Sequence, residues 1–278
     1  MTVLITPAEL ATALASDHPP VVLDVRWRLT VAGGQRYDGV TDYLDGHIPG
    51  AVFVDLDEEL AAAGEPTDGR HPLPSAEALQ KEMRRWGVHE GDAVVVYDGE
   101  GNLAAARAWW LLRWAGVADV RLLDGALPAW VAADQPLETG DILPRAGDVV
   151  VRPGGMPTID ADDAAAWSGV LLDARAPERF RGESEPVDPK AGHIPGARNA
   201  PTADNLAPDG RFLPAAQLRA RFEALGVGED TAVAAYCGSG VTAAHEVAAL
   251  AIAGFDAALY PGSWSQWSNQ DRPVATGE

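Results

Sequence analysis

The sequence has only one cysteine, Cys237, among its 278 residues. An internal disulfide is therefore excluded, and the fold takes no support from oxidation. The sequence also lacks an apolar run long enough to span a membrane, and it lacks a basic N-terminal segment followed by an apolar run. We therefore expect a cytoplasmic protein with no membrane segment, whose thiol stays free in a reducing compartment.

Basic residues are also scarce. Lys and Arg together number 21 against 41 Asp and Glu, which gives a formal net charge of −20. A surface of this charge repels a phosphate backbone, so nucleic acid is excluded as a partner and small molecules are favoured. Charged residues at 22% and apolar residues at 47% are typical of a folded globular chain.

The sequence repeats itself in one order. Val21–Arg26 returns as Val170–Arg175, and the segment Gly-His-Ile-Pro-Gly-Ala at 46–51 returns unchanged at 192–197. Ala93–Asp98 corresponds to Ala232–Cys237, and residues 124–130 correspond to 261–267. A duplication of this kind fixes the domain plan. We expect a first domain at 1–142, a linker rich in proline and glycine at 143–157, and a second domain at 158–278.

Each repeat alternates short apolar runs with longer helical patterns. The runs at 21–25 and 94–97 are apolar on both faces, which is typical of parallel strands covered on each side by helices. The predicted fold class is α/β, with two similar domains that each contain a parallel sheet flanked by helices. Because a duplicated chain already provides a cleft between its halves, we expect a monomer.

Cys237 lies at a turn between a predicted strand and a predicted helix. It follows the apolar run 232–236 and precedes Gly238-Ser239-Gly240, after which an alanine-rich helix is predicted. Backbone N–H groups of such a turn converge on an anion, and this setting favours the ionised, nucleophilic form of a thiol. The first repeat has Asp98 at the equivalent position, so only the second can use a thiol. The alternative is a buried, unreactive cysteine.

Together these features resemble the two-domain sulfurtransferases of the rhodanese family, over essentially the whole chain. The resemblance rests on the paired Gly-His-Ile-Pro-Gly-Ala segments, on an Asp-x-Arg in each repeat, and on the loop that Cys237 opens. It implies two tandem rhodanese-like domains, with the first non-catalytic and the second carrying sulfur as a persulfide on Cys237. The loop sequence is similar to that of 3-mercaptopyruvate sulfurtransferases, whereas thiosulfate sulfurtransferases usually have basic residues after the cysteine.

The resemblance also implies a set of site residues. In the family a serine, a histidine and an aspartate form a proton relay, and the matching positions are Ser239, His71 and Asp57. The family's carboxylate-binding arginine matches Arg179. The remaining substrate-binding positions are those of the loop and one lysine: Gly238, Gly240, Val241, Thr242 and Lys190. An exposed loop imidazole and a surface arginine are the alternatives for His71 and Arg179. No metal and no cofactor are implied.

The sequence departs from the family at one position. A second substrate arginine is expected where Asp188 stands, and Lys190 is the candidate to replace it. This departure leaves thiosulfate open as an alternative donor to 3-mercaptopyruvate. The expected acceptor of the sulfur is a small thiol, cyanide or a thioredoxin-like protein.

Two other functions compete with this interpretation. Dual-specificity phosphatases share the fold but need an arginine six positions after the cysteine, where this sequence has Ala243. A persulfide carrier with slow turnover is the second alternative. A carrier has no need for a proton relay, so the relay residues favour an enzyme.

Overall fold

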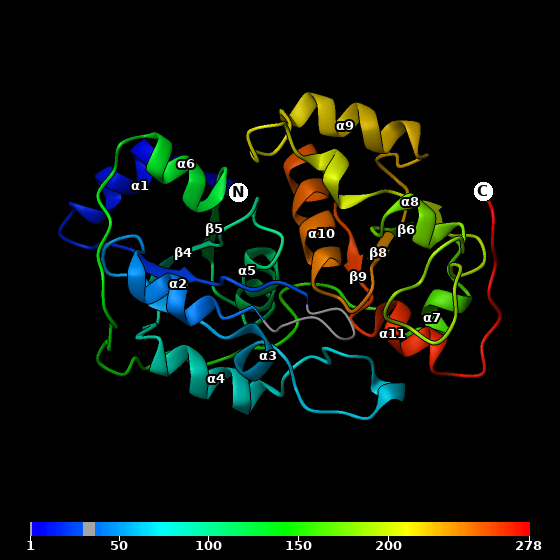
Figure 1. The fold of residues 1–278 in the computed structure, drawn as a ribbon, viewed down its shortest axis with the longest axis horizontal. Coiled ribbons are helices and arrows are strands. Elements are labelled where there is room, and N and C mark those ends of the chain that lie inside the picture. The colour runs from blue at the N-terminus through cyan, green and yellow to red at the C-terminus, as the bar shows by residue number, and fades with distance from the viewer. Residues whose placement is uncertain (1, 30–36) are drawn as a thin grey trace.

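The structure is a computed structural model that describes residues 2–29 and 37–278, and it consists of two α/β halves side by side (Figure 1). The sheet of the first half has the spatial order β1-β5-β4-β2-β3, and that of the second half has the order β7-β6-β8-β9. All neighbouring strands pair in parallel. The strands are β1 (Leu4–Ile5), β2 (Val21–Asp24), β3 (Val52–Phe53), β4 (Ala93–Tyr97), β5 (Asp119–Leu123), β6 (Val170–Asp173), β7 (Arg198–Asn199), β8 (Val233–Tyr236) and β9 (Ala258–Leu259).

The internal repeat of the sequence corresponds to a repeat of the sheets. Val21 of β2 pairs with Val94 of β4, and Val170 of β6 pairs in the same way with Val233 of β8. The matched segments 93–98 and 232–237 therefore end at the same edge of their respective sheets. The predicted fold class is confirmed in both halves.

Helices cover both faces of each sheet because successive strand residues point to opposite sides. In β4, Val94 and Val96 join the core cluster under α4 and α5, whereas Val95 and Tyr97 join the cluster under α1 and α6. The first half contains α1 (Pro7–Leu14), α2 (Gly39–Asp45), α3 (Leu56–Glu59), the 3₁₀ turn η1 (Pro66–Asp68), α4 (Ala76–Arg85), α5 (Ala105–Trp114) and α6 (Ala126–Ala132). The second contains α7 (Ala161–Ala165), α8 (Pro177–Phe180), the 3₁₀ turn η2 (Thr202–Asn205), α9 (Ala215–Ala224), α10 (Thr242–Ala253) and α11 (Ser263–Ser268).

Helix α5 of the first half packs against α10 of the second at the centre of the molecule (Figure 1). Small alanine side chains on both helices allow this approach, and one apolar cluster runs through the contact. The segment 143–157 lies along the first half, where Gly147 N–H donates to the Arg84 carbonyl at 2.8 Å and Arg152 N–H donates to the Ala115 carbonyl at 2.8 Å. The two halves are thus held together beside the turn that carries Cys237.

Two helices of the first half begin at side-chain caps. Thr6 caps α1 with a reciprocal bond to Glu9, and the Ser75 hydroxyl accepts a hydrogen bond from the Ala78 N–H at the start of α4. None of the helices in the described part of the chain is long and apolar enough to cross a membrane.

Candidate active site

Cys237 opens a short turn between β8 and α10. Its side chain is 2% exposed, and its Sγ accepts a hydrogen bond from the Gly240 N–H at 3.2 Å. Gly240 has a φ of 80°, and a Cβ at this residue would lie 2.4 Å from the Pro261 carbonyl oxygen. Only glycine can therefore fill this position, which bends the backbone so that an N–H points back at the sulfur.

A second turn, at residues 260–265, holds the base of the Cys237 loop. The Cys237 N–H donates to the Ser263 hydroxyl at 3.1 Å, and the Trp264 N–H donates to the Cys237 carbonyl at 3.0 Å. The Ser265 N–H donates to the Gly238 carbonyl at 2.8 Å. Because its polar backbone groups are satisfied in this way, the loop is fixed before any substrate arrives.

Three residues predicted as a proton relay lie in one chain of hydrogen bonds. The Ser239 Oγ lies 2.8 Å from His71 Nδ1, and His71 Nε2 lies 3.2 Å from Asp57 Oδ1. Trp27 orients the carboxylate by donating its indole N–H to the same Asp57 oxygen at 2.9 Å. His71 and Ser239 are buried. The alternative of an exposed loop imidazole is therefore wrong, and the hydrogen bonds form a continuous path from Asp57 to the cysteine loop.

Two arginines approach the loop from different halves of the molecule. A Cβ on Gly238 would lie 3.2 Å from Nη2 of Arg70 and 3.5 Å from Nη1 of Arg179. Arg70 comes from the first half and Arg179 from α8 of the second. The Nε and Nη2 atoms of Arg70 are buried without a hydrogen-bond partner in the described structure. Buried unpaired donors of a guanidinium group indicate a place for an anion.

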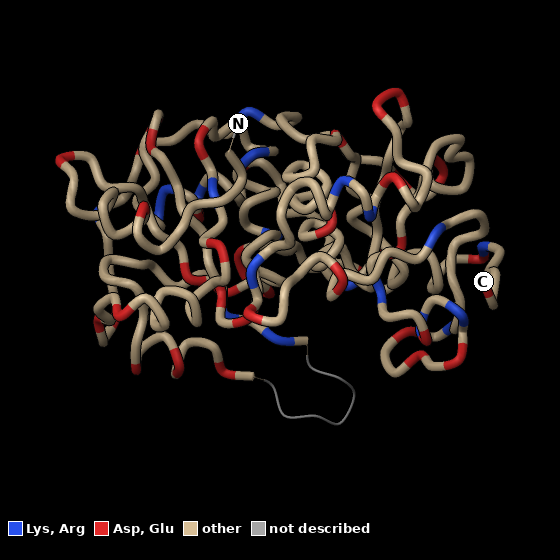
Figure 2. Tube along the Cα trace, turned by 90° about the horizontal axis from the view of Figure 1, so that it is seen from above, with Lys and Arg blue, Asp and Glu red and all other residues tan. Residues whose placement is uncertain are grey.

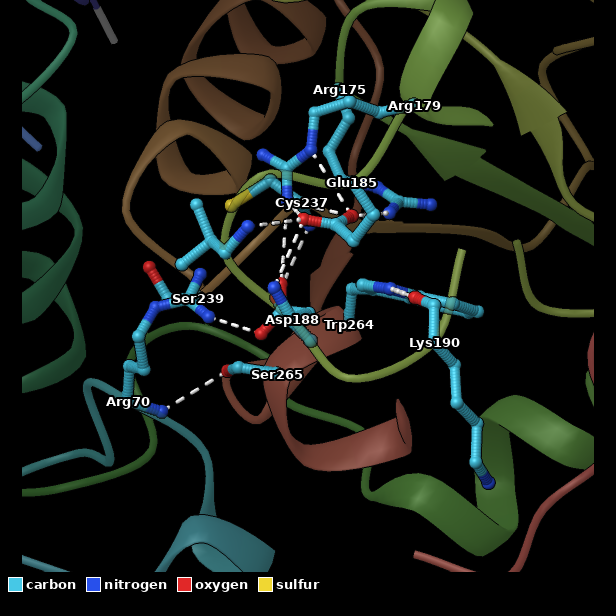
Figure 3. Close-up of polar contacts among 12 residues, drawn as sticks. Arg70, Arg175, Arg179, Glu185, Asp188, Lys190, Cys237, Ser239, Trp264 and Ser265 are labelled. Atoms are coloured by element: carbon cyan, nitrogen blue, oxygen red, sulfur yellow. Dashed lines mark hydrogen bonds and ion pairs between the residues drawn. The ribbon is translucent and has the colours of Figure 1, made fainter. Parts of the chain in front are cut away.

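Asp188 lies between these arginines. Its carboxylate forms an ion pair with Nη1 of Arg70 and accepts a hydrogen bond from Nη2 of Arg179 at 3.3 Å (Figure 3). Glu185 binds Arg179 from the other side, with its Oε1 2.7 Å from Nη2. Burial raises the pKa of Asp188, and the charge of Arg70 opposes this rise. Asp188 therefore holds two arginine side chains in place, whereas the family has an arginine at this position.

Lys190 does not occupy the role predicted for it. Its Nζ donates to the Gln270 carbonyl at 2.7 Å, and its side chain points away from Cys237 in Figure 3. The reason is the backbone: the Trp264 indole N–H donates to the Lys190 carbonyl at 2.9 Å and fixes the loop with the lysine turned outward. The geometry places Arg70, and not Lys190, beside Arg179.

A cavity of about 600 Å³ opens in front of the sulfur. It is lined by Cys237 and Ser239 with Arg70 and Arg179, and by apolar side chains such as Trp27. Gly238, Val241 and Thr242 also line it, whereas Gly240 contributes through its N–H to the sulfur. The cavity therefore combines cationic and apolar side chains beside the sulfur.

The equivalent turn of the first half is closed by Asp98. Its carboxylate accepts hydrogen bonds from the backbone N–H groups of Glu100, Asn102, Ala104 and Ala105, at 2.8 to 3.1 Å. The turn thus keeps its ring of N–H donors but fills it with a carboxylate of its own. This half contributes its loop residues to the site instead of a second nucleophile.

Both halves match the rhodanese-like domain, at residues 6–133 and 159–270. The chain belongs to the rhodanese-like family. Relatives match it over nearly its whole length. It is 48% identical over 284 residues to a Pseudomonas aeruginosa protein that carries the name 3-mercaptopyruvate sulfurtransferase, covering 99% of this chain and 98% of the relative. It is 50% identical over 281 residues to SseB of Mycobacterium tuberculosis, which carries the name thiosulfate sulfurtransferase, covering 99% and 97%.

Solved structures agree with this assignment to the rhodanese-like sulfurtransferases. The crystal structure of the Escherichia coli 3-mercaptopyruvate enzyme SseA matches with a TM-score of 0.82 and 33% identity, covering 95% of this chain and 99% of that one. The 3-mercaptopyruvate sulfurtransferase from Leishmania major matches with a TM-score of 0.85 and 28% identity, covering 98% and 75%. Sulfur transfer is the activity that this rhodanese-like chain shares with its named relatives.

Arg70 is the site residue that the sequence analysis missed. It immediately precedes His71, so its neighbour was a signal, but no repeat or spacing distinguishes it from a surface arginine. Its position depends on the Ser265 hydroxyl, which accepts a hydrogen bond from the Arg70 N–H at 3.0 Å across the two halves. Contacts between segments this far apart in the sequence cannot be derived from local patterns.

Proposed function

We propose that the protein transfers a sulfur atom from 3-mercaptopyruvate, through a persulfide on Cys237, to a thiol or cyanide acceptor. The observation that carries this proposal is the hydrogen-bonded chain from Asp57 through His71 to Ser239, which ends at the cysteine loop. Transfer from 3-mercaptopyruvate needs a proton to move, because the donor loses a thiol proton and its carbon gains one. Thiosulfate carries no such proton, so a relay gives it no advantage.

The donor's carboxylate is proposed to lie at Arg70 and Arg179, where the unpaired Nε and Nη2 of Arg70 supply buried donors. The Cys237 thiolate attacks the donor sulfur, the carbon–sulfur bond breaks, and its electron pair passes to the enolate of pyruvate. The relay takes the proton of the donor thiol and returns it to the enolate carbon. Pyruvate leaves, and the enzyme holds Cys–S–S⁻.

In the second half of the cycle, an acceptor thiolate attacks the outer sulfur of the persulfide. The sulfur–sulfur bond breaks, the acceptor leaves as its own persulfide, and the Cys237 thiolate is restored. The Gly240 N–H, 3.2 Å from Sγ, supports the negative charge of the restored thiolate. We propose a small thiol or a thioredoxin-like protein as acceptor, and a monomer in a reducing compartment such as the cytoplasm, because Cys237 must stay unoxidised. The boundaries 1–142, 143–157 and 158–278 remain our proposal for the domains.

Thiosulfate is the second candidate donor, and a specific observation favours it. The guanidinium groups of Arg70 and Arg179, which line the cavity, attract a dianion more strongly than a monoanion. Asp188 and Glu185 offset this attraction, because each ion pair neutralises part of the arginine charge. The balance therefore favours the monoanion 3-mercaptopyruvate.

The test is a comparison of steady-state rates with the two donors under the same conditions. The proposal predicts a higher kcat/KM for 3-mercaptopyruvate, measured as pyruvate, than for thiosulfate, measured as thiocyanate with cyanide. A higher value for thiosulfate would contradict the choice of donor. Release of one equivalent of pyruvate per chain followed by only slow turnover would indicate a persulfide carrier.

A further inference from the structure

One charged group at the boundary between the halves has no role in the relay or in carboxylate binding. Arg107 of α5 is 0% exposed and lies directly behind the Cys237 loop. Its guanidinium donates to the Leu60 carbonyl from Nε at 3.2 Å, to the His71 carbonyl from Nη2 at 2.9 Å, and to the Gly240 carbonyl from Nη1 at 3.3 Å. It thus binds the segment that carries His71 and the loop that carries the sulfur.

Arg107 has no acidic partner. No carboxylate of the described residues lies within 4.0 Å of its guanidinium, and its neighbours are backbone carbonyls. Burial lowers the pKa of Arg107 to about 10, and the attraction of the Cys237 thiolate opposes this fall. A buried charge without a counter-ion costs several kcal/mol. An anion close by lowers this cost.

The other charged groups near the sulfur cancel one another. Arg70 pairs with Asp188 and Arg179 pairs with Glu185, while Arg175 pairs with Asp173 at 2.6 Å. His71 reaches the loop only through Ser239. In the described part of the chain, these groups and Arg107 are the charged or titratable groups that face the Cys237 loop, and Arg107 alone among the described arginines there has no carboxylate partner.

We infer that Arg107 is a positioning residue and the buried counter-cation of the Cys237 sulfur anion. This inference rests on the proposed persulfide cycle, in which the site holds one negative charge throughout, on Sγ in Cys–S⁻ and on the adjoining outer sulfur in Cys–S–S⁻. A fixed cation therefore serves both states without moving. The same side chain sets geometry, because it holds the carbonyl of Gly240, whose N–H binds the sulfur, and the carbonyl of His71.

The experiment measures the rate of alkylation of Cys237 by iodoacetamide as a function of pH. Arg107→Met removes the charge, Arg107→Lys keeps it, and Arg113→Gln changes an arginine further along the same helix as a control. We expect the pH midpoint of alkylation to rise by about one unit or more in Arg107→Met, the effect of losing a neighbouring opposite charge. Arg107→Lys should restore most of this shift, and Arg113→Gln should match the unmodified protein.

A merely structural role would lower the unfolding temperature of Arg107→Met and leave the alkylation midpoint in place. A folded Arg107→Met protein with the midpoint of Arg113→Gln would overturn the inference. Alkylation uses no sulfur donor, so its outcome is independent of whether 3-mercaptopyruvate is the substrate. A failure of the donor assay and a failure of this inference are therefore distinguishable.

If Arg107→Met does not fold, a measurement on the wild-type protein tests the inference instead. The Nε–H resonance of Arg107, assigned by its loss in Arg107→Lys, is followed after alkylation with iodoacetamide and separately with iodoacetate. The first adduct is neutral and the second is anionic, at similar size. We expect the neutral adduct to move the resonance more than the anionic one. Equal shifts, or none, would overturn the inference.

Discussion

Replacement of Ser239 by alanine tests the proton relay directly. The Ser239 hydroxyl lies 2.8 Å from His71 Nδ1 and lines the cavity beside the sulfur, so the substitution removes the end of the relay that faces the donor. A positioned acid–base group contributes about 10²- to 10⁴-fold to a rate. We expect kcat with 3-mercaptopyruvate to fall about 100-fold, which corresponds to about 2.7 kcal/mol of transition-state stabilisation. Transfer from thiosulfate, which moves no proton, should fall far less.

The assay follows pyruvate by coupled reduction with NADH and thiocyanate by its iron complex, on the same preparation. Ser268→Ala is the matched control, because Ser268 is also buried but lies at the end of α11 outside the cavity. A double variant with His71→Asn should lose little more than Ser239→Ala alone, since residues of one relay act as a unit. Equal losses with the two donors, or additive losses in the double variant, would refute the relay.

Three further predictions concern binding and stability. Arg70→Met removes the buried unpaired donors, so KM for 3-mercaptopyruvate should rise about tenfold, with a smaller change in kcat. An unchanged KM would exclude Arg70 from the carboxylate site. Asp98→Asn weakens four backbone hydrogen bonds and should lower the free energy of unfolding by about 2 kcal/mol or more in urea titrations, with donor preference unchanged. Burial lowers the pKa of His245 to about 3, whereas the unfolded chain titrates near 6.5. The unfolded state therefore binds the proton first, and stability falls with pH below about 6.5, by about 2 kcal/mol at pH 5. His245→Phe should lack this component; an equal pH dependence in both proteins would contradict it.

The fold was largely predictable because its information is local and repeated. Apolar runs at 21–25 and 94–97 predict buried parallel strands, and their return in the second half predicts a second sheet of the same plan. Short elements such as β3 and β7 were not predicted individually, since two residues carry no periodicity. Their place is set by pairing with β2 and β6.

The site was predictable only in part. Cys237 and the glycine at 240 belong to one turn, so their relation could be predicted from adjacent residues. Ser239, His71 and Asp57 came from a resemblance, and the structure brings them together across the two halves. The predicted place of Lys190 at the substrate was wrong. The Trp264 indole N–H, from a turn distant in the sequence, donates to the Lys190 carbonyl and fixes the loop with the lysine side chain turned outward.

Arg70 and Arg107 escaped prediction for a different reason. Their importance lies in partners that their guanidinium groups lack among residues 2–29 and 37–278: Arg70 has buried donors without an acceptor, and Arg107 has no carboxylate near its charge. Such absences exist only in three dimensions. In the trace of Figure 2, acidic and basic residues are interspersed over both halves, so charge along the chain does not mark these two arginines.

The central claim is that sulfur passes through Cys237. The most direct measurement is the intact mass of the protein after incubation with 3-mercaptopyruvate and no acceptor, followed by peptide mapping. We predict a mass increase of one sulfur atom on the peptide that contains Cys237, with one equivalent of pyruvate released per chain and loss of the added sulfur when a thiol is supplied. Pyruvate formation without added sulfur on this peptide, or undiminished turnover by Cys237→Ser, would contradict the account.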